Sequence, residues 1–399
     1  MTLHRIRFKK VSDVKSALTL TGAGRIDVEF LILCLLLIVF GAVMNYSASS
    51  VYAQQLYGSS TYFLIRHVLF ALLSIAITVP FVLYGTRNFW HRFARGIYLV
   101  AIGMLLLVLV IGTVGGGAQR WLRLGPITVQ PSEVAKLALV MMLARFLADN
   151  EKTVTSTGKG NFIYGVLLPG GLIGAIGVLV ALEKHISGLM ILGMIGIAVM
   201  FLGGTRLKWI LLIAGAVVLA GSGLILVSEY AQTRVNTWLH IDTVDPLGEA
   251  WQTLQGLYAI GSGGIFGLGL FASRQKFGYV SQPQNDFVFT VLCEELGLLG
   301  AAAVILLFSL LVIRGFRIAM RQRDRFSSLV VYGLIFKVAI QTVLNLAVVT
   351  NSMPNTGISL PFFSSGGTSL ALQIFEMGIV LNLSRERDGR NFIQGKESK

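Results

Sequence analysis

The stretch VEFLILCLLLIVFGAVMNYSA at residues 28–48 decides the fold class of this 399-residue chain. Its apolar residues continue over the length that a helix needs to cross a membrane, about 20 residues. The run is too long for the core of a signal peptide, and no convincing cleavage site follows it. We therefore interpret it as a retained membrane-spanning helix.

Nine further apolar runs follow the first along the chain. They lie near residues 62–84, 96–113, 132–148, 162–182, 186–203, 209–228, 287–313, 327–350 and 368–383. Only 13% of the residues are charged, against about 25% in an ordinary soluble domain. This composition excludes a soluble globular enzyme, and runs of this length exclude a β-barrel. The fold class predicted is an all-α polytopic integral membrane protein with about ten transmembrane helices.

The distribution of positive charge predicts the orientation. The net charge is +14, and most Lys and Arg residues fall in the two tails and in every second loop, as cytoplasmic segments do. We therefore interpret the basic charge as a topological signal, with no nucleic acid as partner. The predicted organisation is a cytoplasmic tail at 1–27, a membrane domain at 28–383 with an extracytoplasmic loop at 229–285, and a cytoplasmic tail at 384–399.

Three segments rich in turn formers then fall on the outer side. They are residues 115–133, the Gly-rich and polar part of the long loop from 259 to 285, and residues 351–367. The Gly-rich stretch AIGSGGIFGLGL (259–270) carries too large a helix-propensity penalty for one continuous helix. A functional site facing the outer leaflet is the natural inference.

Glu133 and Lys136 are one helical turn apart at the start of the fourth run, so each can neutralise the other. Two interpretations stay open: a structural ion pair, or the polar floor of an outer cavity. Ser132 is a plausible N-cap for that helix. Arg120, on an outer segment where positive charge is disfavoured, needs an anionic partner, and Lys184 and His185 could extend the same basic patch.

Asp286 is the most informative single residue, because it stands where the long outer loop meets an apolar run. A partly desolvated acid there could serve as a general base, or it could cap the helix. Glu294 and Glu295 lie deeper in the same run, and Lys337 in the next run is a possible counter-charge for one of them.

Several chemistries have no motif in this sequence. There is no P-loop, no dinucleotide fingerprint, and no Cys/His cluster with metal spacing; Cys34 and Cys293 both lie in apolar runs. An enzyme without these motifs must use a substrate that is already activated.

Four long segments resemble the SEDS family (shape, elongation, division and sporulation). They are RWLRLGPITVQPSEVAKL (120–137), GSGGIFGLGL (261–270), QKFGYVSQPQNDFVFTVLCEELGLLG (275–300) and TGISLPFFSSGGTSL (356–370). The chain departs from the usual family pattern at Gln282, at Asn285 and in the turn EKHISG (183–188). The resemblance leans toward the division and sporulation branch.

The resemblance implies a peptidoglycan glycosyltransferase of the bacterial cytoplasmic membrane. Such proteins polymerise lipid II, the undecaprenyl-pyrophosphate-linked disaccharide peptide, and work with a class B penicillin-binding transpeptidase and other division or elongation proteins. By the family's motifs, Asp286 corresponds to the essential acidic residue on the outer side, and it is the implied catalytic residue. The implied substrate-binding residues are Arg120, Glu133, Lys136, Lys184, His185, Gln252, Lys276, Asn285, Ser365 and Gly366.

The mechanism predicted is an inverting one, in which Asp286 deprotonates the acceptor hydroxyl and nearby cations stabilise the leaving pyrophosphate. A divalent cation, Mg²⁺ or Mn²⁺, could assist, although the sequence has no dedicated metal cage and no cofactor is certain. The rivals are a transporter of lipid-linked cell-wall precursor and a scaffold for cell-wall enzymes. Intramembrane charges argue against the scaffold, since a scaffold has no reason to keep them.

The topology can be tested directly by cysteine labelling. We expect a cysteine introduced between residues 235 and 255 to react with a membrane-impermeant maleimide added to intact cells. A cysteine between 318 and 323 should react only after the cells are permeabilised, because that segment carries cytoplasmic arginines. The reverse labelling pattern would contradict the placement of the site on the outer side.

Overall fold

A computed structural model describes residues 25–115, 118–125, 127–156, 158–227, 229–241, 243, 245, 248, 250–365 and 367–385. Each of the ten predicted apolar runs falls on a helix. Among these described residues, six helical segments are long and apolar enough to cross a membrane: Val28–Tyr57, Tyr62–Tyr84, Arg87–Ile111, Lys159–Leu182, Val288–Met320 and Arg325–Val349.

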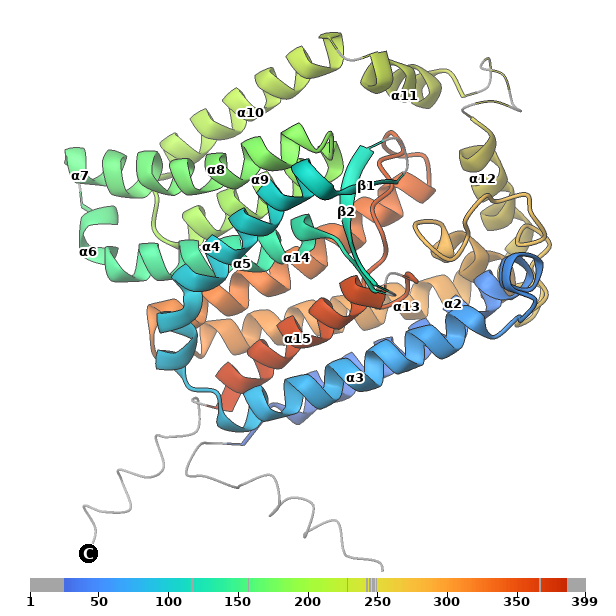
Figure 1. The fold of residues 1–399 in the computed structure, drawn as a ribbon, viewed down its shortest axis with the longest axis horizontal. Helices are drawn as coiled ribbons and strands as arrows, with labels where there is room; N and C mark the ends of the chain where they lie inside the picture. Colours follow the sequence, from blue (N-terminus) through green and yellow to red (C-terminus); the bar gives the residue numbers. More distant parts are fainter. Residues whose placement is uncertain are drawn as a thin grey trace, which may run out of the picture.

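The helices lie side by side in one bundle (Figure 1). Its long helices are α2 (Val28–Tyr57), α3 (Tyr62–Tyr84), α4 (Arg87–Ile111), α5 (Pro131–Asp149), α8 (Leu168–Leu182), α9 (Ile186–Leu202), α10 (Leu207–Val227), α13 (Val288–Met320), α14 (Arg325–Val349) and α15 (Gly367–Ser384). The short helices α6 (Glu151–Val154) and α7 (Lys159–Phe162) and the π-helical turn η1 (Ile163–Leu167) lead into α8. In α14, 67% of the most apolar stretch is buried, against 33% or less in the other five, so α14 lies at the centre.

The first residue of α2 and the last of α15 lie at one end of the bundle, on the left in Figure 1. The backbone N–H of Asp27 donates to the Ser384 hydroxyl across 3.1 Å, which joins these two ends. The segments at 113–129 and 251–287 gather at the opposite end (Figure 1). The placement of these segments on the outer side of a membrane stays a prediction.

The predicted helical fold is confirmed, and the structure adds two details to these segments. One is a small antiparallel sheet of the strands β1 (Thr113–Gly115), β2 (Ala118–Leu124) and β3 (Ile127–Val129), in which Leu122 pairs with Val129. Residues 115–133 alternate too briefly for a strand pattern to stand out. The other is that the described part of the loop predicted at 229–285 includes the helices α11 (Glu229–Leu239) and α12 (Trp251–Gly263). The Gly-rich stretch does stop being helical after Gly263.

That Gly-rich stretch docks against a break in α13. Gly297 has φ 65° and ψ −164° inside α13, which interrupts the helical hydrogen bonds. The backbone groups near the break form hydrogen bonds with the stretch instead. The Leu268 N–H donates to the backbone carbonyl of Glu294 at 2.9 Å, and the Leu298 N–H donates to the backbone carbonyl of Gly264 at 2.9 Å. A side chain at Gly297 would meet the backbone nitrogen of Gly267 at 2.4 Å, so the close approach requires glycine.

We expect Gly297→Ala to lower the apparent Tm of the purified protein by several degrees. The change places a side chain in a φ/ψ region that is essentially restricted to glycine, at a cost of about 1–3 kcal/mol, and drives it into neighbouring backbone. Gly103→Ala is the matched control, because open space surrounds that helical glycine and alanine favours a helix. Equal thermal unfolding of the two variants would contradict this account of the break.

Candidate functional site

A polar cavity of about 360 Å³ opens at the end of the bundle where the sheet and the long loop gather. We call it the chamber. Six predicted site residues line it: Arg120, Glu133, Lys136, His185, Asn285 and Asp286. The chamber is also lined by Trp121, Gln130, Ser187, Gly188, Ile191, Arg234, Gln282, Gln341, Thr356, Gly357, Ile358, Ser359, Ser364 and Ser369.

Asp286 is held in place by a hydrogen bond to its backbone carbonyl, and its carboxylate is not part of that contact. Asn345, on α14, donates its side-chain amide to the carbonyls of Asp286 at 2.8 Å and Ile358 at 2.7 Å. The alternative that Asp286 caps the next helix is wrong, because Phe287 is the N-cap of α13 and that position has no side-chain cap bond. The carboxylate is therefore not used for helix capping.

The surroundings of Asp286 change its acidity. Burial raises its pKa to about 6, while its own backbone N–H and the positive charge of Arg234 act in the opposite direction. A carboxyl group with this pKa is largely ionised at neutral pH, and it binds a proton more readily than an ordinary aspartate with a pKa of about 4. This combination suits a general base.

Arg234, on α11, was missed by the sequence analysis. It lines the chamber, and its guanidinium donates to the carbonyl of Asn355. The signal was available, since Arg234 is another positive residue on a segment predicted to lie outside, like Arg120.

Glu133 and Lys136 form the predicted pair: Lys136 Nζ lies 2.6 Å from Glu133 Oε1. The prediction that Lys337 neutralises Glu294 or Glu295 is wrong. Lys337 instead contacts Glu376 at 2.7 Å and Glu133 at 3.6 Å.

Glu294 and Glu295 have other partners, all in the loop that precedes Asp286 or on α2. Glu295 accepts from Ser47 at 2.6 Å and is paired with Lys276 at 3.0 Å. Glu294 accepts from the Ser273 hydroxyl and from the Arg274 N–H at 3.0 Å. Which loop lies against α13 cannot be read from the spacing of charges along one helix.

The tight turn between α8 and α9 contributes His185 to the chamber. Its Nδ1 lies 3.1 Å from the Ser132 hydroxyl. Ser132 is therefore not the N-cap that was predicted; the cap position is Gln130, without a side-chain bond. Burial first, and then the charges of Lys136 and Arg120, lower the pKa of His185 to about 4, so the ring is neutral at pH 7.

The neighbouring Glu183 is buried. Burial raises its pKa to about 8, with the charge of Arg120 opposing the shift. This carboxyl group is therefore mostly protonated at neutral pH, and it is not among the residues that line the chamber.

The remaining predicted residues lie outside the chamber. Lys184 is exposed in the tight turn, with φ 56°. Lys276 is buried in its pair with Glu295, and Gln252 lines a smaller cavity of about 80 Å³ that shares Arg234 with the chamber. Ser365 contacts the chamber indirectly: its hydroxyl donates to the side-chain oxygen of Asn285, a lining residue, at 2.7 Å. Gly366 falls outside the described residues.

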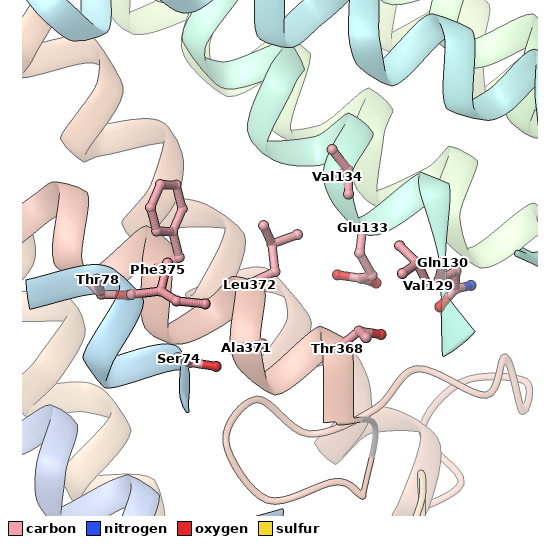
Figure 2. A pocket seen from close by; sticks show the side chains of 11 residues that line it. Ser74, Thr78, Val129, Gln130, Glu133, Val134, Thr368, Ala371, Leu372 and Phe375 are labelled. Carbon is pink, nitrogen blue, oxygen red and sulfur yellow. The ribbon is translucent and has the colours of Figure 1, made fainter. Parts of the chain in front are cut away.

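An apolar pocket of about 250 Å³ adjoins the chamber between α3, α5 and α15. Leu372 and Phe375 of α15 form one side, and the Glu133 carboxylate points into the pocket (Figure 2). Glu133 and Gln130 line both cavities. A polar and an apolar cavity thus share a wall.

The donor set does not fit a dedicated metal site. Among the residues that the structure describes, no group of three or more His, Cys, Asp or Glu side chains is placed to hold a metal ion. Arg120, Lys136 and Arg234 are the charged groups of the chamber that could stabilise an anion.

Comparisons with known proteins identify the family of this chain. The family model described as cell cycle protein, which groups FtsW, RodA and SpoVE, matches residues 28–389. Stage V sporulation protein E of Bacillus subtilis is 38% identical over 90% of this chain and 97% of its own length. A probable peptidoglycan glycosyltransferase FtsW of Geobacter metallireducens is 35% identical over 93% and 98% of the two chains.

A solved structure has the same fold. It is a chain from a study of how a peptidoglycan synthase complex coordinates polymerization and crosslinking, with a TM-score of 0.75 and 26% identity over 91% of this chain and 98% of that chain. The family model and the relatives cover most of the sequence, including every described element of the chamber. The chain therefore belongs to the FtsW, RodA and SpoVE family of cell cycle proteins.

Proposed function

We propose that this protein is a peptidoglycan glycosyltransferase that polymerises lipid II. One observation carries the proposal. The chamber is lined by two carboxylates, Asp286 and Glu133, and Glu133 is held by Lys136 and Lys337. Asp286 is therefore the carboxylate available to accept a proton.

The reaction is a single displacement at a sugar carbon. Asp286 takes the proton of the acceptor's 4-hydroxyl as that oxygen forms a bond to the anomeric carbon of the donor strand. The bond from the anomeric carbon to the donor's pyrophosphate breaks, and undecaprenyl pyrophosphate leaves with the electron pair. One base and one displacement invert the anomeric centre, whereas retention needs a second carboxylate as nucleophile.

The positive side chains of the chamber supply the electrostatic part. Negative charge grows on the departing pyrophosphate, and Arg120, Lys136 and Arg234 surround the space where it would form. Fixed charges in a partly water-excluded site stabilise such a transition state strongly. A diphosphate leaves without needing much protonation, so one acid–base residue suffices.

The apolar pocket accounts for a lipid-linked substrate. An isoprenoid chain lying between α3, α5 and α15 would place its diphosphate beside Glu133 and Lys136, where the two cavities meet. Burial of apolar area stabilises binding by about 25 cal/mol per Å². A water-soluble nucleotide sugar would leave this pocket unused.

The membrane placement belongs to the same proposal. Ten spans with both termini in the cytoplasm put the chamber at the outer face of the bacterial cytoplasmic membrane, with residues 229–285 outside. The similar solved chain comes from a complex that couples polymerization to crosslinking. That likeness supports a class B penicillin-binding transpeptidase as partner, in division, shape or sporulation.

A lipid II flippase is the alternative function. The break in α13 at Gly297 resembles the discontinuous helices of transporters. The backbone groups at this break, however, bond to the Gly-rich stretch, and Gly297 does not line the chamber. This makes polymerisation the better supported of the two.

We expect Asp286→Asn to lower lipid II polymerisation by about 10²–10⁴-fold, the usual contribution of a general base. The fold should survive, because Asn345 holds the backbone of residue 286 and not its carboxylate. The measurement is glycan chain formation from lipid II by purified protein with its transpeptidase. Glu229→Gln is the control, since Glu229 is an exposed acid of the same loop. An Asn variant that polymerises normally but no longer moves precursor across vesicles would favour the flippase.

The pH dependence of polymerisation should have an acid limb near pH 6. Asp286 must be ionised to accept a proton, and its pKa is raised to about 6, so kcat/KM should fall about tenfold per pH unit below that value. Glu183→Gln should leave the limb in place, because the pKa of Glu183 is about 8. A limb near pH 4 would show that the essential base is an ordinary exposed carboxylate.

A further inference from the structure

Four side chains of alternating charge form a row through the centre of the bundle. Lys136 Nζ lies 2.6 Å from Glu133 Oε1, and Lys337 Nζ lies 3.6 Å from Glu133 Oε2. Lys337 Nζ also donates to both Glu376 oxygens, at 2.7 and 2.9 Å. The row joins α5, α14 and α15, and its formal charges sum to zero.

The two members of the row farther from the chamber, Lys337 and Glu376, cannot touch a substrate there. Lys337 is 1% exposed and Glu376 is fully buried, and neither lines the chamber or the apolar pocket. Stability alone does not explain them, because a buried ion pair can often be replaced by apolar side chains without loss. Their geometry instead connects them to Glu133, which lines both cavities.

The hydrogen-bond donors of the two lysines are used differently. An ammonium group has three protons to donate. Those of Lys337 are directed at Glu376 and Glu133, whereas the hydrogen bond found for Lys136 within the described structure goes to Glu133 alone. Lys136 lies in the chamber wall, so it can also turn toward an anion there.

An anion that draws Lys136 away would take the closest cation from Glu133. A buried carboxylate without a partner is strongly unfavourable. Lys337 removes this obstacle, because it stays beside the second oxygen of Glu133 and is itself fixed by Glu376.

We propose that Lys337 and Glu376 are a positioning pair that compensates Glu133, so that Lys136 can transfer its ammonium group from Glu133 to a diphosphate in the chamber. The identity of the anion rests on the proposed function. The pair acts through Glu133 and touches neither the substrate nor the reacting atoms.

The test is the lipid II affinity of four purified proteins: the wild type, K337M/E376L, E133Q, and the triple variant E133Q/K337M/E376L. We expect K337M/E376L to fold, with an unchanged or higher Tm. Its Kd for lipid II should rise about tenfold, which corresponds to about 1.4 kcal/mol. In this variant Lys136 is the one cation left beside Glu133, so it cannot move to the diphosphate without leaving a buried carboxylate unpaired. Adding K337M/E376L to E133Q should cause no further rise, since no carboxylate remains to hold Lys136.

The matched control is D27N/R314Q, which neutralises another partly buried ion pair of 2.8 Å at the opposite end of the bundle. The lipid II affinity of this control should equal that of the wild type.

Two results would overturn the proposal: wild-type affinity in K337M/E376L, or the same tenfold loss with and without Glu133. If the wild type with its transpeptidase neither binds nor polymerises lipid II, the proposed function itself is wrong and the diphosphate assignment falls with it. Polymerisation by the wild type separates these two failures.

Discussion

Non-helical backbone that enters an apolar helix bundle must find hydrogen-bond partners, because no water is there to supply them. Two asparagines meet this constraint at the chamber. Asn345 bonds to the carbonyls of Asp286 and Ile358, and Asn45 of α2 bonds to those of Gln284 at 3.5 Å and Phe363 at 3.1 Å. Each asparagine thus ties the two loops of the chamber to each other and to a fixed helix. The position of the Asp286 carboxylate depends on these four bonds.

The same constraint explains the acidic pair on α13. Glu294 and Glu295 accept bonds from backbone and side chains of residues 273–276 and from Ser47. An anion at that depth would be costly alone, but each carboxylate replaces several missing hydrogen-bond partners of the loop. Lys276 balances part of their charge. These residues shape the loop that leads to Asp286, whereas the substrate contact that the family resemblance suggested for Lys276 stays a prediction.

Sequence reasoning succeeded where the signal is local. Run length predicted the helices, and the one-turn spacing of Glu133 and Lys136 predicted their pair. It failed where the partner is set by packing between distant elements. Lys337 and Glu376 are 39 positions apart and meet because α14 and α15 are neighbours, and no spacing rule reports this. Likewise Ser132 has the residue type of an N-cap, but the nearby turn brings His185 to its hydroxyl. Arg234 could have been predicted from the sequence by the same reasoning as Arg120, because it is also an arginine on a segment predicted to lie outside.

The shared wall between the two cavities constrains the kind of molecule that can occupy both. The chamber has charged, amide and hydroxyl groups among its lining residues, and the pocket beside it is lined chiefly by apolar residues such as Leu372 and Phe375. A single ligand fills both only if it is amphiphilic, with its most polar group at the boundary where Glu133 lies. An unpaired carboxylate at that boundary would repel both a hydrocarbon chain, by its hydration, and a diphosphate, by its charge. The two lysines on Glu133 cancel this repulsion, and that makes one position compatible with a lipid on one side and an anion on the other.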